Sequence, residues 1–124
     1  IDAAVAGELG VPAIFVASDE AGCAEASRFL PWAVTVATKR GEGWNRAFSK
    51  HPARAAGEIA AGVRRAVERL GEMRTFTFPG PLLLEVRFKR VAQAVNAWAR
   101  HRGWRPAGLY TVRRRLERIS EWPG

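Results

Sequence analysis

The sequence predicts an α/β protein, with part of a doubly wound, mostly parallel sheet over residues 1–50 and a small α+β subdomain over residues 51–124. Residues 11–17 form an apolar run without polar alternation, which is typical of a strand covered on both faces. The order strand, helix, strand up to residue 38 is that of a βαβ unit. After residue 52 the predicted order is helix, strand, helix, strand, which favours a separate small layer.

Local patterns place the individual elements of this fold. Helices are expected over residues 1–9, about 19–29, about 53–71 and about 91–102, and strands over about 12–17, 32–38, 82–89 and 110–116. Residues 39–52 are expected to be a loop, and residues 117–122 a frayed end. Residues 82–89 alternate between apolar and polar side chains, so this strand is expected to be antiparallel or at an edge, with one wet face.

A polar turn, Ser18, Asp19 and Glu20, follows the first strand at the edge where doubly wound sheets gather ligands. The turn has two interpretations. In the first, its carboxylates take part directly in the chemistry of a site at this edge. In the second, the side chain of Ser18 or Asp19 caps the next helix, because it accepts hydrogen bonds from the first free N–H groups of that helix. We expect the cap, because these residue types cap helices routinely.

The predicted loop over residues 39–52 combines glycines with cations, an amide and an aromatic side chain. Such a loop is suited to closing over an anion, with Lys39 as a point charge. The order of a Walker phosphate-binding loop is absent. The alternative is a solvated surface loop with Trp44 and Phe48 in the core. Lys39 and Asn45 are the candidate substrate-binding residues, from loop position alone.

Two helices carry apolar stripes that are expected to face the core. In the helix over residues 53–71, which Pro52 begins, the spacing is four, four and three residues, and in the helix over residues 91–102 it is four and three. The first stripe is Ile59, Val63, Val67 and Leu70, and the second is Val91, Val95 and Trp98. Arg64 and Glu68 are expected to pair at i,i+4 on another face.

The net charge of +8 belongs to the last third of the chain. Residues 1–86 hold ten basic and ten acidic residues, whereas residues 87–124 hold ten basic residues against two glutamates. A basic α+β module that binds nucleic acid, or serves assembly, through residues 87–118 is therefore an alternative function. Its basic face would hold Arg87, Lys89, Arg113 and Arg115, with Trp98, Trp104 and Tyr110 nearby for stacking. No recognised nucleic-acid motif is present, and Trp98 fits a core stripe better.

The remaining composition argues against a membrane segment, an internal disulfide, a metal site and a nucleophile triad. No apolar run approaches the roughly 20 residues that span a bilayer, so no membrane partner is expected. Cys23 is the only cysteine, which rules out an internal disulfide, favours a cytoplasmic setting and suits a small buried side chain. The two histidines, His51 and His101, lack neighbours at metal-ligand spacing, and no nucleophile triad can be named.

Five separated segments carry a recognisable pattern at plausible spacing, over residues 3–12, 15–26, 36–39, 51–52 and 78–88. Together they resemble the C-terminal half of the zinc D-aminopeptidases associated with dipeptide-permease operons. The resemblance implies a two-domain α/β metallopeptidase, often a ring-shaped homo-oligomer. Such an enzyme removes N-terminal D-residues from short peptides with two zinc ions and a metal-activated water.

The resemblance also implies that no catalytic residue and no zinc ligand lies in this chain. The family's last ligand is a Glu of a Gly-Glu pair that would lie about three residues before Ile1. Glu8 also follows a glycine, but it comes one to two helical turns too late. The chain starts without Met inside a predicted helix, so we expect a fragment that is inactive alone and whose partner is a missing N-terminal half. Departures from the family pattern are Asp2, where Asn is expected, and the basic segment from Lys89.

Overall fold

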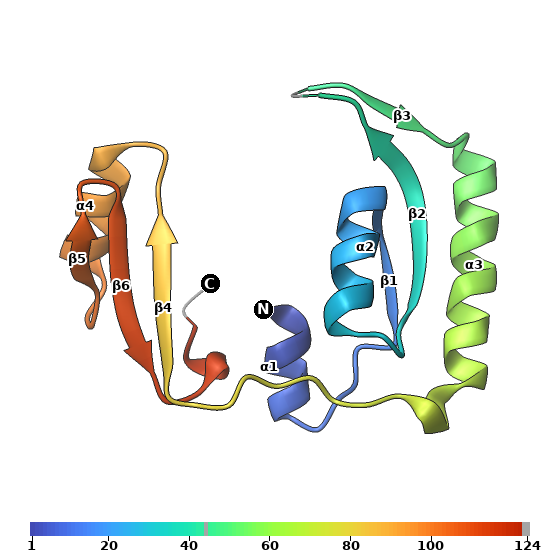
Figure 1. Ribbon diagram of the computed structural model, residues 1–124, viewed down its shortest axis with the longest axis horizontal. Coiled ribbons are helices and arrows are strands. Elements are labelled where there is room, and N and C mark those ends of the chain that lie inside the picture. Colours follow the sequence, from blue (N-terminus) through green and yellow to red (C-terminus); the bar gives the residue numbers. More distant parts are fainter. Residues whose placement is uncertain (44, 123–124) are drawn as a thin grey trace. The chain divides into compact units, whose positions relative to one another are not determined.

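The computed structural model describes residues 1–43 and 45–122 and has a mixed α/β fold (Figure 1). Within these residues there are two three-stranded sheets and four α-helices. Contacts divide the chain into two compact units, Asp2–Thr77 and Phe78–Gly124 together with Ile1. None of the described helices is long and apolar enough to cross a bilayer.

The sheet of the first unit is built on the βαβ unit that the sequence predicts. Strand β1 (Phe15–Asp19) pairs in parallel with β2 (Val34–Gly41), and helix α2 (Glu20–Phe29) connects them. Strand β3 (Ala47–Ser49) pairs antiparallel with β2, so the strand order is β1-β2-β3. The short helix α1 (Asp2–Glu8) precedes β1 and buries Ala4 completely.

The prediction of a loop over residues 39–52 is partly wrong, because β2 and β3 form a β-hairpin within this range. Strand β2 continues to Gly41, and β3 returns alongside it. The amide of Glu42 donates to the carbonyl of Arg46 at 2.8 Å and closes the turn. Phe48 is 61% exposed, so the alternative that places it in the core is wrong, and Trp44 lies outside the described residues.

Helix α3 (Pro52–Glu68) packs on β1 and β2 through small residues. Figure 1 shows α2 and α3 on opposite sides of these strands. Gly62 approaches the sheet so closely that a Cβ there would lie 2.7 Å from Cε2 of Phe15 and 2.8 Å from Cγ2 of Val36. Ala66, one turn further on, is fully buried. Pro52 begins the helix, as predicted.

The predicted core stripe is therefore wrong for three of its four residues, whereas Ile59 is half-buried. Val63 and Val67 are 39% and 55% exposed, because Gly62 and Ala66 occupy the face of α3 that meets the sheet, and Leu70, which is 53% exposed, lies beyond the end of α3 at Glu68. The ion pairs are also different. Within the described residues, Arg54 pairs with Glu58 at i,i+4, and no ion pair joins Arg64 to Glu68.

The position of α3 bears on the division of the chain. The sequence predicts a domain boundary after residue 50, whereas the compact units divide after Thr77. Helix α3 packs on the first sheet, which favours the later boundary. The assignment of whole domains remains a prediction.

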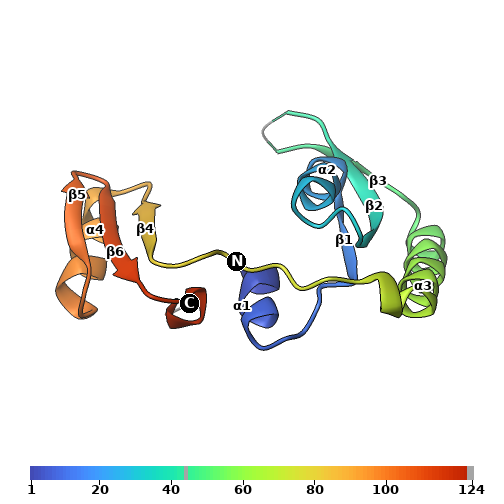
Figure 2. The same cartoon turned by 60° about the horizontal axis from the view of Figure 1, so that its bottom comes forward.

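The sheet of the second unit is antiparallel, with the strand order β4-β6-β5. Its strands are β4 (Leu82–Arg87), β5 (Arg105–Gly108) and β6 (Thr111–Leu116). The alternation predicted for β4 is confirmed, since Leu84 and Val86 pack into the core while Leu83 is 66% exposed. Helix α4 (Val91–Arg100) lies along β5 and β6, as Figure 2 shows.

The core of the second unit is centred on Ala94, Trp104 and Val112, which are at most 8% exposed. Val95 and Trp98 of α4 are 50% and 51% exposed, so the predicted stripe of this helix is wrong as well. The prediction of a frayed end over residues 117–122 is also wrong. Residues Ile119–Glu121 form a 3-10 helix in which Ile119 is buried.

Candidate functional site

The carboxyl ends of β1 and β2 bring together the polar residues that the sequence singles out. Parallel strands end at one edge of the sheet, where ligands of α/β proteins gather. The pairing of β1 with β2 shifts between Ser18 and Asp19, so that Asp19 lies opposite Lys39. The turn after β1 and the cationic end of β2 are therefore neighbours.

Asp19 caps helix α2. Its Oδ1 accepts a hydrogen bond from the backbone N–H of Gly22 at 2.7 Å. The hydroxyl of Thr38 donates to the carbonyl of Ser18 at 3.2 Å and ties the turn to β2. The cap expected from the sequence is confirmed.

A cationic pocket of about 320 Å³ opens at this edge of the sheet. Its polar and aromatic lining consists of Glu20, Lys39, Arg40, Phe48, Ser49 and Lys50. The lining contains three cations and one carboxylate. Arg40 and Lys50 are each paired with a glutamate, so Lys39 is the cation of the lining that is best able to attract an anionic group. The Arg40 guanidinium pairs with Glu42 at 3.4 Å and lies 5.6 Å from the centroid of the Phe48 ring.

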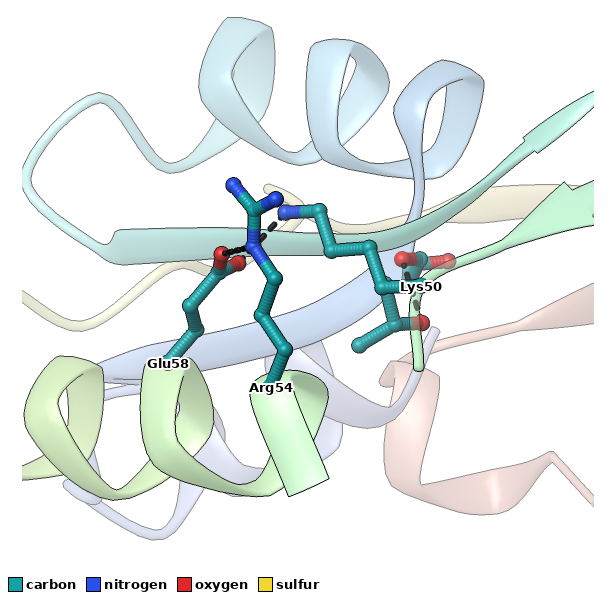
Figure 3. Close-up of polar contacts among 5 residues, drawn as sticks. Lys50, Arg54 and Glu58 are labelled. Atoms are coloured by element: carbon teal, nitrogen blue, oxygen red, sulfur yellow. Dashed lines mark hydrogen bonds and ion pairs between the residues drawn. The ribbon is translucent and has the colours of Figure 1, made fainter. Parts of the chain in front are cut away.

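Lys50 is held by an ion-pair network with helix α3 (Figure 3). Its Nζ donates to Oε2 of Glu58, and Nε of Arg54 donates to Oε1 of the same carboxylate at 2.9 Å. These hydrogen bonds, first that from Lys50 and then that from Arg54, lower the pKa of Glu58 below its ordinary value. Glu58 thus compensates Lys50, whereas Lys39 forms no ion pair within residues 1–43 and 45–122.

Of the two candidate substrate-binding residues, one lines the cationic pocket and the other does not. Lys39 lines the cationic pocket, while Asn45 lies exposed in the hairpin turn and is not part of the lining. Their role in substrate binding remains a prediction. The ion pair of Lys50 with Glu58 was not predicted from the sequence. The pair of Arg54 with Glu58 could have been predicted, because these residues are spaced i,i+4 on a helix.

The described residues do not fit a zinc site. Among residues 1–43 and 45–122, no three His, Cys, Asp or Glu side chains form a group that could hold a metal ion. His51 caps α3, with Nδ1 accepting from the N–H of Ala53 at 3.3 Å, and His101 follows the last turn of α4. Cys23 is buried at 8% exposure, as predicted.

The predicted basic face is confirmed in part: Arg87, Arg113 and Arg115 lie on one face of the second sheet, whereas Lys89 lies beyond the end of β4 at Arg87. The register places Arg113 opposite Glu85 and Arg115 opposite Leu83, so these side chains lie on the exposed side of the sheet. The expected stacking surface is not assembled there. Trp104 is 8% exposed, in the core that α4 covers, and Trp98 belongs to α4. The pattern expected of a single-stranded nucleic-acid site is therefore incomplete.

Comparison with known proteins identifies the class. The family model of peptidase family M55, described as D-aminopeptidase, matches residues 1–122, and the chain belongs to this family. Among solved structures, the chain is similar to the Zn-dependent D-aminopeptidase DppA from Bacillus subtilis, described as a self-compartmentalizing protease. The TM-score is 0.84 and the sequence identity 25%, over 97% of this chain and 44% of DppA. The chain thus spans less than half of the length of DppA. No curated protein sequence matches significantly.

Proposed function

We propose that this chain is the C-terminal portion of a zinc-dependent D-aminopeptidase that removes N-terminal D-residues from short peptides. The observation that carries the proposal is the match to the D-aminopeptidase family over residues 1–122. The similarity to DppA over 97% of the chain supports it independently. Hydrolysis by zinc-activated water is proposed for the complete enzyme and not for residues 1–124 alone.

The zinc ligands are proposed to come from polypeptide outside these residues. Two observations support this: the described residues hold no metal-binding group, and more than half of DppA has no counterpart in the chain. The missing portion would also extend the sheet. Strand β1 is an edge strand with helices on both of its faces, which is the setting of an inner strand in a doubly wound, mostly parallel sheet.

We further propose that Lys39 binds the C-terminal carboxylate of the peptide in the cationic pocket, with Asn45 approaching from the hairpin turn. Lys39 supports this role because it lines the pocket and forms no ion pair in the described part of the chain. A homo-oligomer is proposed because DppA is described as self-compartmentalizing. The cytoplasmic setting remains a prediction from the single cysteine.

The test of the proposal uses the complete gene product loaded with zinc. Release of D-alanine from D-Ala-Ala is expected, together with much slower hydrolysis of L-Ala-Ala and no activity of residues 1–124 alone. Folded, zinc-loaded protein that releases no D-residue would contradict the proposed function.

The role of Lys39 has its own test. Lys39→Ala is expected to raise KM about tenfold for peptides with a free C-terminal carboxylate, the loss of one charge-assisted hydrogen bond. The same substitution should leave KM unchanged for the C-terminally amidated peptide. Arg64→Ala, which removes an exposed cation of α3, is the matched control. An equal change in KM for both peptides would refute the assignment of Lys39.

A further inference from the structure

A second cationic pocket lies on the sheet of the second unit, and the peptidase proposal does not use it. This arginine pocket has a volume of about 520 Å³ and is lined by Leu83, Gly103, Arg105, Arg113, Arg114 and Arg115. Four guanidinium groups and no carboxylate therefore contribute to the lining. Arg105, Arg113 and Arg114 form no ion pair within residues 1–43 and 45–122.

The strand register places like charges directly opposite one another. Arg105 of β5 is the pairing partner of Arg113 of β6, so their side chains lie on one face with Cβ atoms about 5 Å apart. Arg115 projects from the same face two residues further along β6. Like charges at directly opposed positions destabilise a sheet. An anion bound between them would remove this cost.

The carboxylates of the unit do little to neutralise the pocket. Glu85 of β4 lies opposite Arg113 in the strand register, but it is not part of the pocket lining and forms no ion pair within residues 1–43 and 45–122. Arg115 and Glu117 lie 3.6 Å apart, but both side chains are more than 70% exposed, at 71% and 72%, so the pair contributes little. Residues 78–124 hold ten basic and three acidic residues, a net charge of +7. The potential at the pocket is therefore strongly positive.

Gly103 shapes one side of the pocket. Its backbone adopts φ +90°, and a Cβ there would lie 3.2 Å from Nε of Arg114. The side chain of Arg114 consequently passes directly over the glycine backbone. Although Arg114 lies opposite Leu84, on the inner row of the sheet, this path brings it into the lining with the three outer arginines.

We propose that the arginine pocket binds a small, multiply charged phosphate compound, of the class of pyrophosphate or a phosphate ester. A carboxylate offers two oxygens and one charge, which one guanidinium fork satisfies. Four guanidinium groups require a ligand with more oxygens and more negative charge than a carboxylate has, and a phosphate dianion provides both. Nucleic acid is the less suitable phosphate source, because no described tryptophan lines the pocket to stack on bases.

The proposal is tested by titrating the 124-residue chain with inorganic pyrophosphate in an isothermal calorimeter at low ionic strength. Saturable binding is expected. Arg105→Glu replaces the opposed like charge by a cross-strand pair with Arg113, so the variant should fold at least as well as the parent. Its affinity for pyrophosphate should fall at least about tenfold, as for loss of a charged hydrogen bond. The thermal midpoint measured without pyrophosphate shows whether folding is intact.

Two controls make the result specific. Arg64→Glu on α3 changes the net charge by the same amount far from the pocket in sequence, and it should bind pyrophosphate as the parent does. Citrate, a carboxylate of similar charge, should bind at least about tenfold more weakly than pyrophosphate.

Four results would overturn the proposal: no binding of pyrophosphate by the parent chain, equal losses in Arg105→Glu and Arg64→Glu, citrate binding as tightly as pyrophosphate, or a single-stranded oligonucleotide that binds more tightly with the same dependence on Arg105. The last outcome would assign the pocket to nucleic acid instead.

Discussion

Gly62 allows a direct measurement of how closely α3 packs on the first sheet. In Gly62→Ala, the new methyl group would lie 2.7 Å from Cε2 of Phe15 and 2.8 Å from Cγ2 of Val36. Both distances are well below van der Waals contact, and Val36 is only 7% exposed, so the sheet has little room to yield. Overpacking of this kind costs about 1–3 kcal/mol.

The same substitution also has a favourable contribution, because alanine is about 0.8–1.0 kcal/mol better than glycine inside a helix. Gly57 provides the control for it. This glycine lies in the same helix, and a Cβ there would meet nothing within 4 Å. Gly57→Ala should therefore stabilise the protein by up to about 1 kcal/mol, from the favourable contribution alone.

The difference between the two variants isolates the packing. Urea denaturation followed by circular dichroism should show Gly62→Ala less stable than Gly57→Ala by about 1–3 kcal/mol. If the two variants have equal midpoints, α3 does not press Gly62 against Phe15 and Val36, and the packing described above is wrong.

Two further predictions concern the edge of the first sheet. Asp19→Ala removes the cap of α2 and should lower the free energy of unfolding by about 0.5–2 kcal/mol. Asp19→Asn keeps the accepting oxygen, so its free energy of unfolding should fall by less. Equal decreases for the two variants in a urea titration would contradict the assignment of the cap. Because its ion pairs lower the pKa of Glu58 from the ordinary value of 4.5, its stabilising contribution is complete above about pH 4.5 and is lost as the pH falls through the lowered pKa. Urea titrations of the parent and of Glu58→Gln should thus converge as the pH falls below about 4.5, with Glu68→Gln as the control, and a gap that widens toward low pH would refute the assignment.

The family assignment could be reached from the sequence because several short segments at plausible spacing carry the family pattern together, although none of them is sufficient alone. Residues 3–12 cover most of α1, residues 15–26 cover all of β1 and most of α2, and residues 78–88 contain β4. The structure adds that these segments fall into two compact units.

The site was only partly predictable. Lys39 could be named because it directly follows a predicted strand, and Asp19 because cap residues have a local signature. Lys50 and Glu58 are eight residues apart in the sequence. Their side chains meet because β3 pairs with β2 and so places Lys50 beside the first turns of α3. The three residues of β3 carry no alternation from which a strand could be predicted.

The sequence by itself determined the elements with a strong local pattern: the βαβ unit, the long helix that begins at Pro52, the alternating strand β4 and the basic last third. Only the tertiary structure decided which helix faces are buried. Gly62, Ala66 and Ala94 face the sheets, while the larger side chains of both predicted stripes stay partly exposed. The physical reason is that a helix approaches a sheet most closely over small side chains, and their fit depends on partners distant in sequence. The pairing of Arg105 with Arg113, on which the proposed anion site rests, likewise comes from strand register alone.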